Sequence, residues 1–100
     1  MNKNVTINCT NGGHFYNVAN IGTKNIDDLY EQAKNESTEK TEDDIAMHLT
    51  ELLIHTVFEE AIAMNLGKVP FVQILHHRDR GVGKDAALVS LDAIVSITVE

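Results

Sequence analysis

The segment His-His-Arg-Asp-Arg-Gly-Val-Gly-Lys, residues 76–84, gathers chemically active side chains around two glycines. Arg guanidinium groups, a Lys and flexible glycine amides are typical of a loop that binds a phosphate or a carboxylate. Histidine also has a suitable pKa for acid–base catalysis, although adjacent strand residues point to opposite faces, so at most one His would serve a given site. We predict an anionic-ligand site formed by His76, His77, Arg78, Arg80 and Lys84. The alternative is a soluble hairpin tip whose charges protect a sheet edge.

The same segment ends in Gly83-Lys84, as a nucleotide-binding P-loop does. That motif requires Gly at position 78, which is Arg, and Ser or Thr at position 85, which is Asp. We therefore exclude nucleoside triphosphate binding through this motif.

A second chemically suggestive pattern is the polar stripe His48, Glu51, His55 and Glu59. Spacings of four residues allow both carboxylates to hydrogen bond to His55 along one helix face. The two His are seven residues apart, about 10 Å along a helix, which is too far to share one metal ion. We expect a solvated stripe, with a metal site and a titrating partner surface as alternatives, and we predict no metal, cofactor or catalytic residue.

The N-terminal segment predicts a hairpin. A type I′ turn at Asn11-Gly12 would place Cys9 opposite His14 and Ile7 opposite Tyr16, and a turn one residue later would keep the same residues on each face. A Cys–His couple can activate a thiolate. A Cys that alternates with apolar strand residues is more typical of a small buried side chain, which is what we expect for Cys9.

Charge is distributed unevenly along the chain. Residues 25–60 hold eleven acidic and two basic side chains, within a net charge of −7. This disfavours direct binding of nucleic acid, but an acidic surface can occupy the basic cleft of a protein partner with fast electrostatic association. The candidate partner-binding residues are Asp43, Asp44, Glu51 and Glu59.

The elements that must position these residues follow from periodicity and capping. Strands are expected at 3–10, 14–20 and 70–77, followed by a last extended run at 86–99 that bends near residues 90–92. A short helix is expected at 26–34, capped by Asn25, and a long helix at 42–66, capped by Thr41. The order β-β-α-α-β-β predicts a single α+β domain over residues 1–100. Its antiparallel sheet would be formed by two β-hairpins and packed on one short and one long helix.

The long helix is apolar around most of its circumference. Its wide apolar arc is formed by Ala46, Met47, Leu53, Ile54, Val57, Phe58, Ala61 and Met64. One sheet face cannot bury so wide an arc. We expect a homodimer contact or a partner groove on the 42–66 helix, the alternative being that the short helix and the loops cover the remainder.

Composition sets the broad class. The 100 residues are 43% hydrophobic and 23% charged, which is typical of a globular domain. One Cys excludes an internal disulfide framework, and neither a membrane-length apolar run nor a signal-peptide core is evident. We expect a cytoplasmic protein without a membrane partner. Nine Asn against two Arg hint at a bacterium, phage or mobile element.

Two functions fit these features. In composition the chain resembles small acidic immunity proteins and phage-encoded inhibitors, and the lack of a complete catalytic motif favours a non-enzymatic protein that inhibits or masks a macromolecular partner. The alternative is a homodimer that binds or hydrolyses a phosphate-bearing small ligand with the 76–84 loop. A subunit of a larger assembly is a third possibility.

Overall fold

The computed structural model describes residues 4–64, 70–77 and 84–100. Its elements in chain order are β1 (Val5–Cys9), β2 (His14–Phe15), β3 (Val18–Ile21), β4 (Lys24–Asn25), α1 (Ile26–Glu36), α2 (Glu42–Met64), β5 (Phe71–His77), β6 (Lys84–Ser90) and β7 (Ile94–Val99). Single 3₁₀ turns occupy Thr10–Gly12 and Leu91–Ala93. The predicted α+β class, with antiparallel pairing and one short and one long helix, is confirmed.

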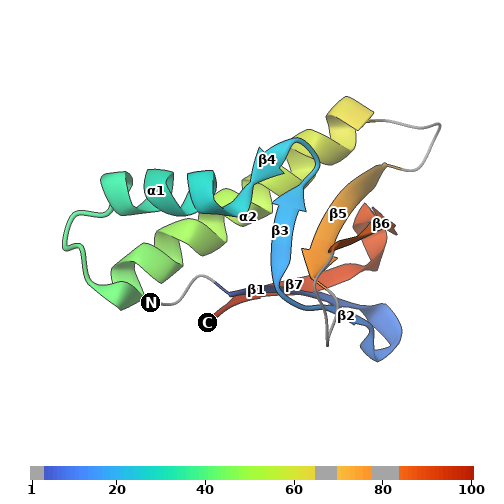
Figure 1. Cartoon of the computed structure of the whole chain (residues 1–100), viewed down its shortest axis with the longest axis horizontal. Coiled ribbons are helices and arrows are strands. Elements are labelled where there is room, and N and C mark those ends of the chain that lie inside the picture. The colour runs from blue at the N-terminus through green and yellow to red at the C-terminus, as the bar shows by residue number, and fades with distance from the viewer. Residues whose placement is uncertain (1–3, 65–69, 78–83) are drawn as a thin grey trace.

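The strands form two sheets, a refinement of the single sheet that the sequence suggested. One sheet has the order β2-β1-β7 and the other β4-β3-β5-β6, and every pair is antiparallel. The segment expected to be one strand at 14–20 is divided between the two sheets, with Asn17 at φ 50° between them. The first and last strands, β1 and β7, pair along their length, so Asn4 and Glu100 lie side by side (Figure 1).

The predicted register of the first hairpin is wrong. Ile7 pairs with Phe15 and Asn8 with His14, so His14 faces Asn8 and not Cys9. The connection is a three-residue 3₁₀ turn in place of a two-residue turn. A shift of one residue exchanges the two faces of a strand, which explains why Phe15 is half-buried and Tyr16 is exposed.

The two helices begin where capping predicts. Asn25 Oδ1 accepts a hydrogen bond from the Asp27 N–H at 2.8 Å, and Thr41 Oγ1 accepts one from the Asp44 N–H at 3.2 Å. Such caps satisfy backbone donors that a helix start otherwise leaves unpaired. Helix α1 then packs along α2, and both extend to one side of the sheets (Figure 1).

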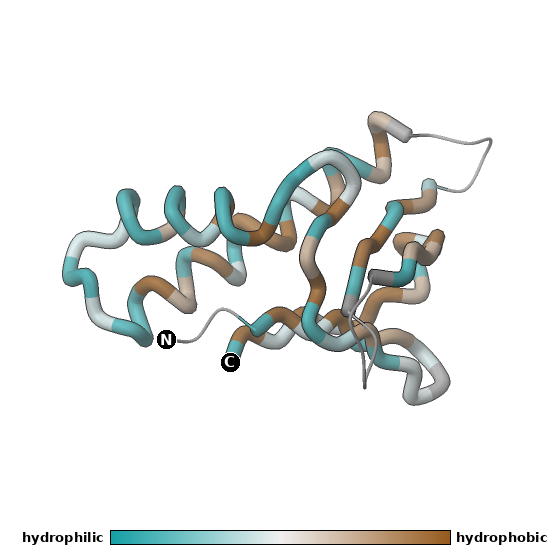
Figure 2. The backbone as a smooth tube through the Cα atoms, viewed as in Figure 1, coloured by the Kyte–Doolittle hydropathy of each residue, from teal (hydrophilic) through white to brown (hydrophobic). Residues whose placement is uncertain are grey.

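Helix α2 is the element that joins the layers, because it contacts α1, β3, β5 and β7. Its buried apolar side chains are Ile45, Leu49, Leu53, Val57 and Ala61. They meet apolar residues from both sheets and from α1, among them Val5, Ile7, Ile21, Leu29, Tyr30, Val72 and Ile74. Figure 2 shows apolar residues along α2 and the strands, whereas the outer side of α1 is hydrophilic.

The turn between β3 and β4 is fixed to α2 by one carboxylate. Glu60 Oε1 accepts hydrogen bonds from the Thr23 N–H, at 2.9 Å, and from the Thr23 hydroxyl. Gly22, at φ +58°, lies so close that a Cβ there would be 2.8 Å from the Glu60 side-chain carbons. Only glycine therefore allows this turn to lie against α2.

We expect Gly22→Ala to destabilise the protein more than Gly12→Ala. Both positions have positive φ, which costs an Ala roughly 1 kcal/mol. A Cβ at Gly12 would meet nothing within 4 Å, whereas a Cβ at Gly22 displaces Glu60 and adds about 1–3 kcal/mol. Urea unfolding of both variants tests this expectation, and an equal loss of stability in the two would contradict it.

Candidate binding surface

The side of α2 that faces away from the core carries large apolar side chains. Met47, Ile54, Phe58 and Ile62 are each 44–68% exposed. Successive residues of a helix are about 100° apart, which places these four on the same side of α2. Neither α1 nor a sheet covers this side, so the arc expected to exceed one sheet face is in part left uncovered.

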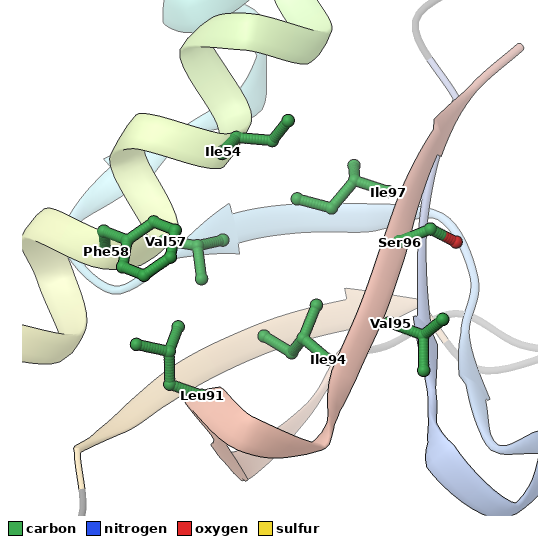
Figure 3. A pocket seen from close by; sticks show the side chains of 8 residues that line it. All are labelled: Ile54, Val57, Phe58, Leu91, Ile94, Val95, Ser96 and Ile97. Carbon is green, nitrogen blue, oxygen red and sulfur yellow. The ribbon is translucent and has the colours of Figure 1, made fainter.

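An apolar groove lies between this side of α2 and β7. It is lined by Ile54, Val57, Phe58, Leu91, Ile94, Val95, Ser96 and Ile97, and it has a volume of about 410 Å³. Figure 3 shows that most of these side chains point from the helix and from β7 into the space between them. No charged residue lines the groove, so it is suited to apolar groups.

Of the predicted partner-binding acids, Asp43, Glu51 and Glu59 are exposed. They do not form one cluster. They are eight residues apart, so each is rotated by about 80° around the helix axis and displaced by about 12 Å along it relative to the one before. Asp43 and Glu51 flank the exposed Met47, at spacings of four residues on either side, whereas Glu59 lies towards the other end of α2.

Asp44, the fourth predicted acid, is engaged within the chain. Its Oδ2 accepts hydrogen bonds from the Ser37 hydroxyl and from the Glu39 N–H, the latter at 3.1 Å. Its Oδ1 lies 3.6 Å from His48 Nε2. The Ser37 hydroxyl first, and then the Glu39 N–H and His48, hold the pKa of Asp44 below its usual value. This carboxylate fastens the α1–α2 connection.

The polar stripe predicted on α2 is only partly observed. His55 and Glu59 are exposed and line a small polar hollow together with Lys24, Gln32 and Thr56. In the described part of the chain, no hydrogen bond joins His55 to Glu51 or to Glu59. The contact between residues four apart on this helix is instead made by Asp44 and His48.

The basic segment can be followed only at its base. His76 is half-buried, its ring lies edge-on to the Phe15 ring at 5.1 Å, and its backbone pairs with Asp85. The backbones of His77 and Lys84 form the last pair of the β5–β6 hairpin. Arg78 and Arg80 lie outside the described residues, so ligand binding by this segment stays a prediction.

The suggested Cys9–His14 couple is not formed. His14 Nδ1 lies 2.7 Å from Asn8 Oδ1 on the outer face of the sheet, and Asn8 Nδ2 donates to Ser96 and Thr98. Cys9 is half-buried against the core, and burial raises the pKa of its thiol. A raised pKa opposes formation of the reactive thiolate.

Among residues 4–64, 70–77 and 84–100, no group of three or more His, Cys, Asp or Glu side chains is placed to hold a metal ion. No helix that they form is long and apolar enough to span a membrane. Comparison with known proteins found no matching family model, curated protein or solved structure.

The sequence does not show that Met47, Ile54, Phe58, Ile62 and Val95 are exposed. Met47, Ile54 and Phe58 belong to the apolar arc of the helix, and Val95 belongs to the alternation of the last strand. The one signal in the sequence for an exposed apolar side of the helix is the excess width of that arc. Periodicity shows that an apolar arc is too wide, but it does not show which side of the arc neighbouring elements will cover.

We expect Asp44→Asn to lower the urea midpoint at neutral pH and to have little effect in strong acid. The contacts to the ionised carboxylate hold its folded-state pKa below the unfolded value of about 3.9. Their stabilisation is therefore fully present above about pH 4 and is lost as the pH falls through the folded-state pKa. Urea unfolding at pH 7 and at successively lower pH measures this.

The matched control is Asp43→Asn, which removes the neighbouring, exposed carboxylate. It should show no comparable pH-dependent difference from wild type. A difference between Asp44→Asn and wild type that stays constant down to the lowest pH would show that the ionised carboxylate is not what stabilises the connection.

Proposed function

We propose that this chain is a small, acidic, non-enzymatic binding protein that inhibits or masks a macromolecular partner with a basic surface. The observation that carries the proposal is the exposed row Asp43, Met47 and Glu51 on α2. An apolar anchor between charges has the anatomy of a protein–protein contact, in which Met is enriched at the centre and charged groups at the rim.

The surroundings of this row support a basic partner. Glu36 ends α1, Glu39 lies in the connection and Glu42 begins α2, and all three are exposed at the end of the helical pair that is remote from the sheets (Figure 1). Lys34 and Lys40 are also exposed at this end, but the acids outnumber them, and an excess of one sign of charge raises the rate of encounter with an oppositely charged protein. The acids repel the phosphate backbone of nucleic acid, so we propose a protein partner.

The proposed setting is the cytoplasm of a bacterium, or of a cell that carries a phage or another mobile element. The unpaired thiol of Cys9 is compatible with a reducing compartment. The acidic row provides recognition and steering, and no chemical step is assigned to it.

We expect Asp43→Lys and Met47→Lys each to reduce partner retention several-fold. The first reverses a rim charge, and the second places a charge at the apolar centre. The measurement is affinity capture from the native host, with the tagged wild-type chain and both variants as bait, at about 0.05 M and about 0.5 M salt. Wild type should retain one protein strongly at low salt and weakly at high salt. Both variants should retain the same protein only weakly.

Glu31→Lys is the matched control, because it makes the same charge change at an exposed position of α1. It should retain the partner nearly as well as wild type. Equal retention by all four baits, or retention that does not weaken with salt, would contradict the proposal. Circular dichroism of each bait shows that it is folded.

A further inference from the structure

Strand β7 has one unused hydrogen-bonding edge. It is the last strand of the β2-β1-β7 sheet and pairs only with β1 among the described residues. Asn4 and Glu100 exchange both backbone hydrogen bonds, each at 2.9 Å. Bonded and non-bonded pairs alternate along an antiparallel ladder, so Thr98 also bonds towards β1. The N–H and C=O groups of Ile97 and Val99 therefore point to the free edge.

This edge has no charge or proline to protect it against pairing with another strand. Natural edge strands use charges, proline or β-bulges; the segment Ile94–Val99 has neither charge nor proline, and its bulge lies at its N-terminal end, so the register from Ser96 to Val99 is regular. By contrast, β6, one of the two edge strands of the other sheet, begins with Lys84 and Asp85. A β-bulge places Val95 as an extra residue in β7, where its side chain is 66% exposed.

The groove continues from this edge to α2, which sets what can occupy it. The free backbone groups of Ile97 and Val99 belong to the sheet layer, whereas Phe58 and Ile62, 50% and 68% exposed, belong to the helix layer above it. A single added strand would cover only the sheet layer. An occupant that covers both must bring a strand and a helix on the same side, which is the arrangement of β7 and α2 in this chain (Figure 3).

We propose that the occupant is a second copy of this chain, with β7 pairing antiparallel to its counterpart about a two-fold axis. The two three-stranded sheets then become one continuous sheet. The two α2 helices lie side by side on it and cover each other's Ile54, Phe58 and Ile62. Such an isologous contact is the commonest form of dimer, since each surface needs to complement only itself.

The charge distribution permits this self-association. Two copies with a net charge of −7 repel each other, but neither β7 nor the groove lining contains a charged residue. The outer face of the sheet at this edge carries the uncharged Asn8, Ser96 and Thr98. The dimer uses residues 54–62 of the exposed side of α2, whereas the Asp43–Met47–Glu51 row lies nearer the start of the same helix, so the dimer does not rest on that proposal.

The first test measures the mass of the full chain by light scattering and ultracentrifugation. Wild type should have twice the 11.1 kDa of one chain. Ile54→Lys and Phe58→Lys should each raise the dimer dissociation constant roughly tenfold or more, because a charge is then desolvated at the contact. Leu88→Lys, the same change at a 55% exposed position of the other edge strand, should remain dimeric. A monomeric wild type at all concentrations would overturn the proposal.

The second test needs no variant and identifies the edge. Amide hydrogen exchange, read by NMR above and below the dissociation constant, should show Ile97 and Val99 protected only in the concentrated sample. The amides of Thr98 and Ser96, which bond to β1, should be protected in both. If the amides of Ile97 and Val99 exchange as fast in the concentrated sample as in the dilute one, the dimer associates through another surface. This result would also overturn the proposal.

Discussion

The structure depends on the burial of one side of α2. This helix is the element that contacts α1 and both sheets, and its Leu49 and Leu53 are fully buried. Burying such a side chain contributes about 1.5–3 kcal/mol. The two sheets belong to separate hydrogen-bonded ladders, so their common packing on α2 places the ends of the chain, the β5–β6 hairpin and the helical pair relative to one another.

The same packing explains why α2 also carries an exposed apolar side. The sheets and α1 cover the side that carries Leu49 and Leu53, and no further described element covers the side that carries Met47, Ile54, Phe58 and Ile62. A chain of this length has a large surface for its volume and cannot cover a long central helix on every side. The uncovered side is divided between an acidic end near the helix connection and an uncharged groove beside β7.

Single polar side chains fix the connections around this framework. Asp44 holds the segment between α1 and α2, and Glu60 holds the turn between β3 and β4. Both carboxylates belong to the acidic stretch that dominates the charge of the sequence, yet they act within the chain. Net charge by segment therefore overstates the charge available to a partner, because it counts carboxylates that are already hydrogen bonded.

The sequence by itself determined the elements: both helices, their caps at Asn25 and Thr41, and the antiparallel α+β class follow from periodicity and capping, which act over a few residues. It also located the acids and the excess apolar arc. Only the tertiary structure decided the register of the first hairpin, the division of the strands into two sheets, the internal role of Asp44 and the exposure of Met47, Phe58 and Val95. These depend on turn length and on which surfaces meet across the fold. Both are set by contacts between residues distant in sequence, which local patterns do not encode.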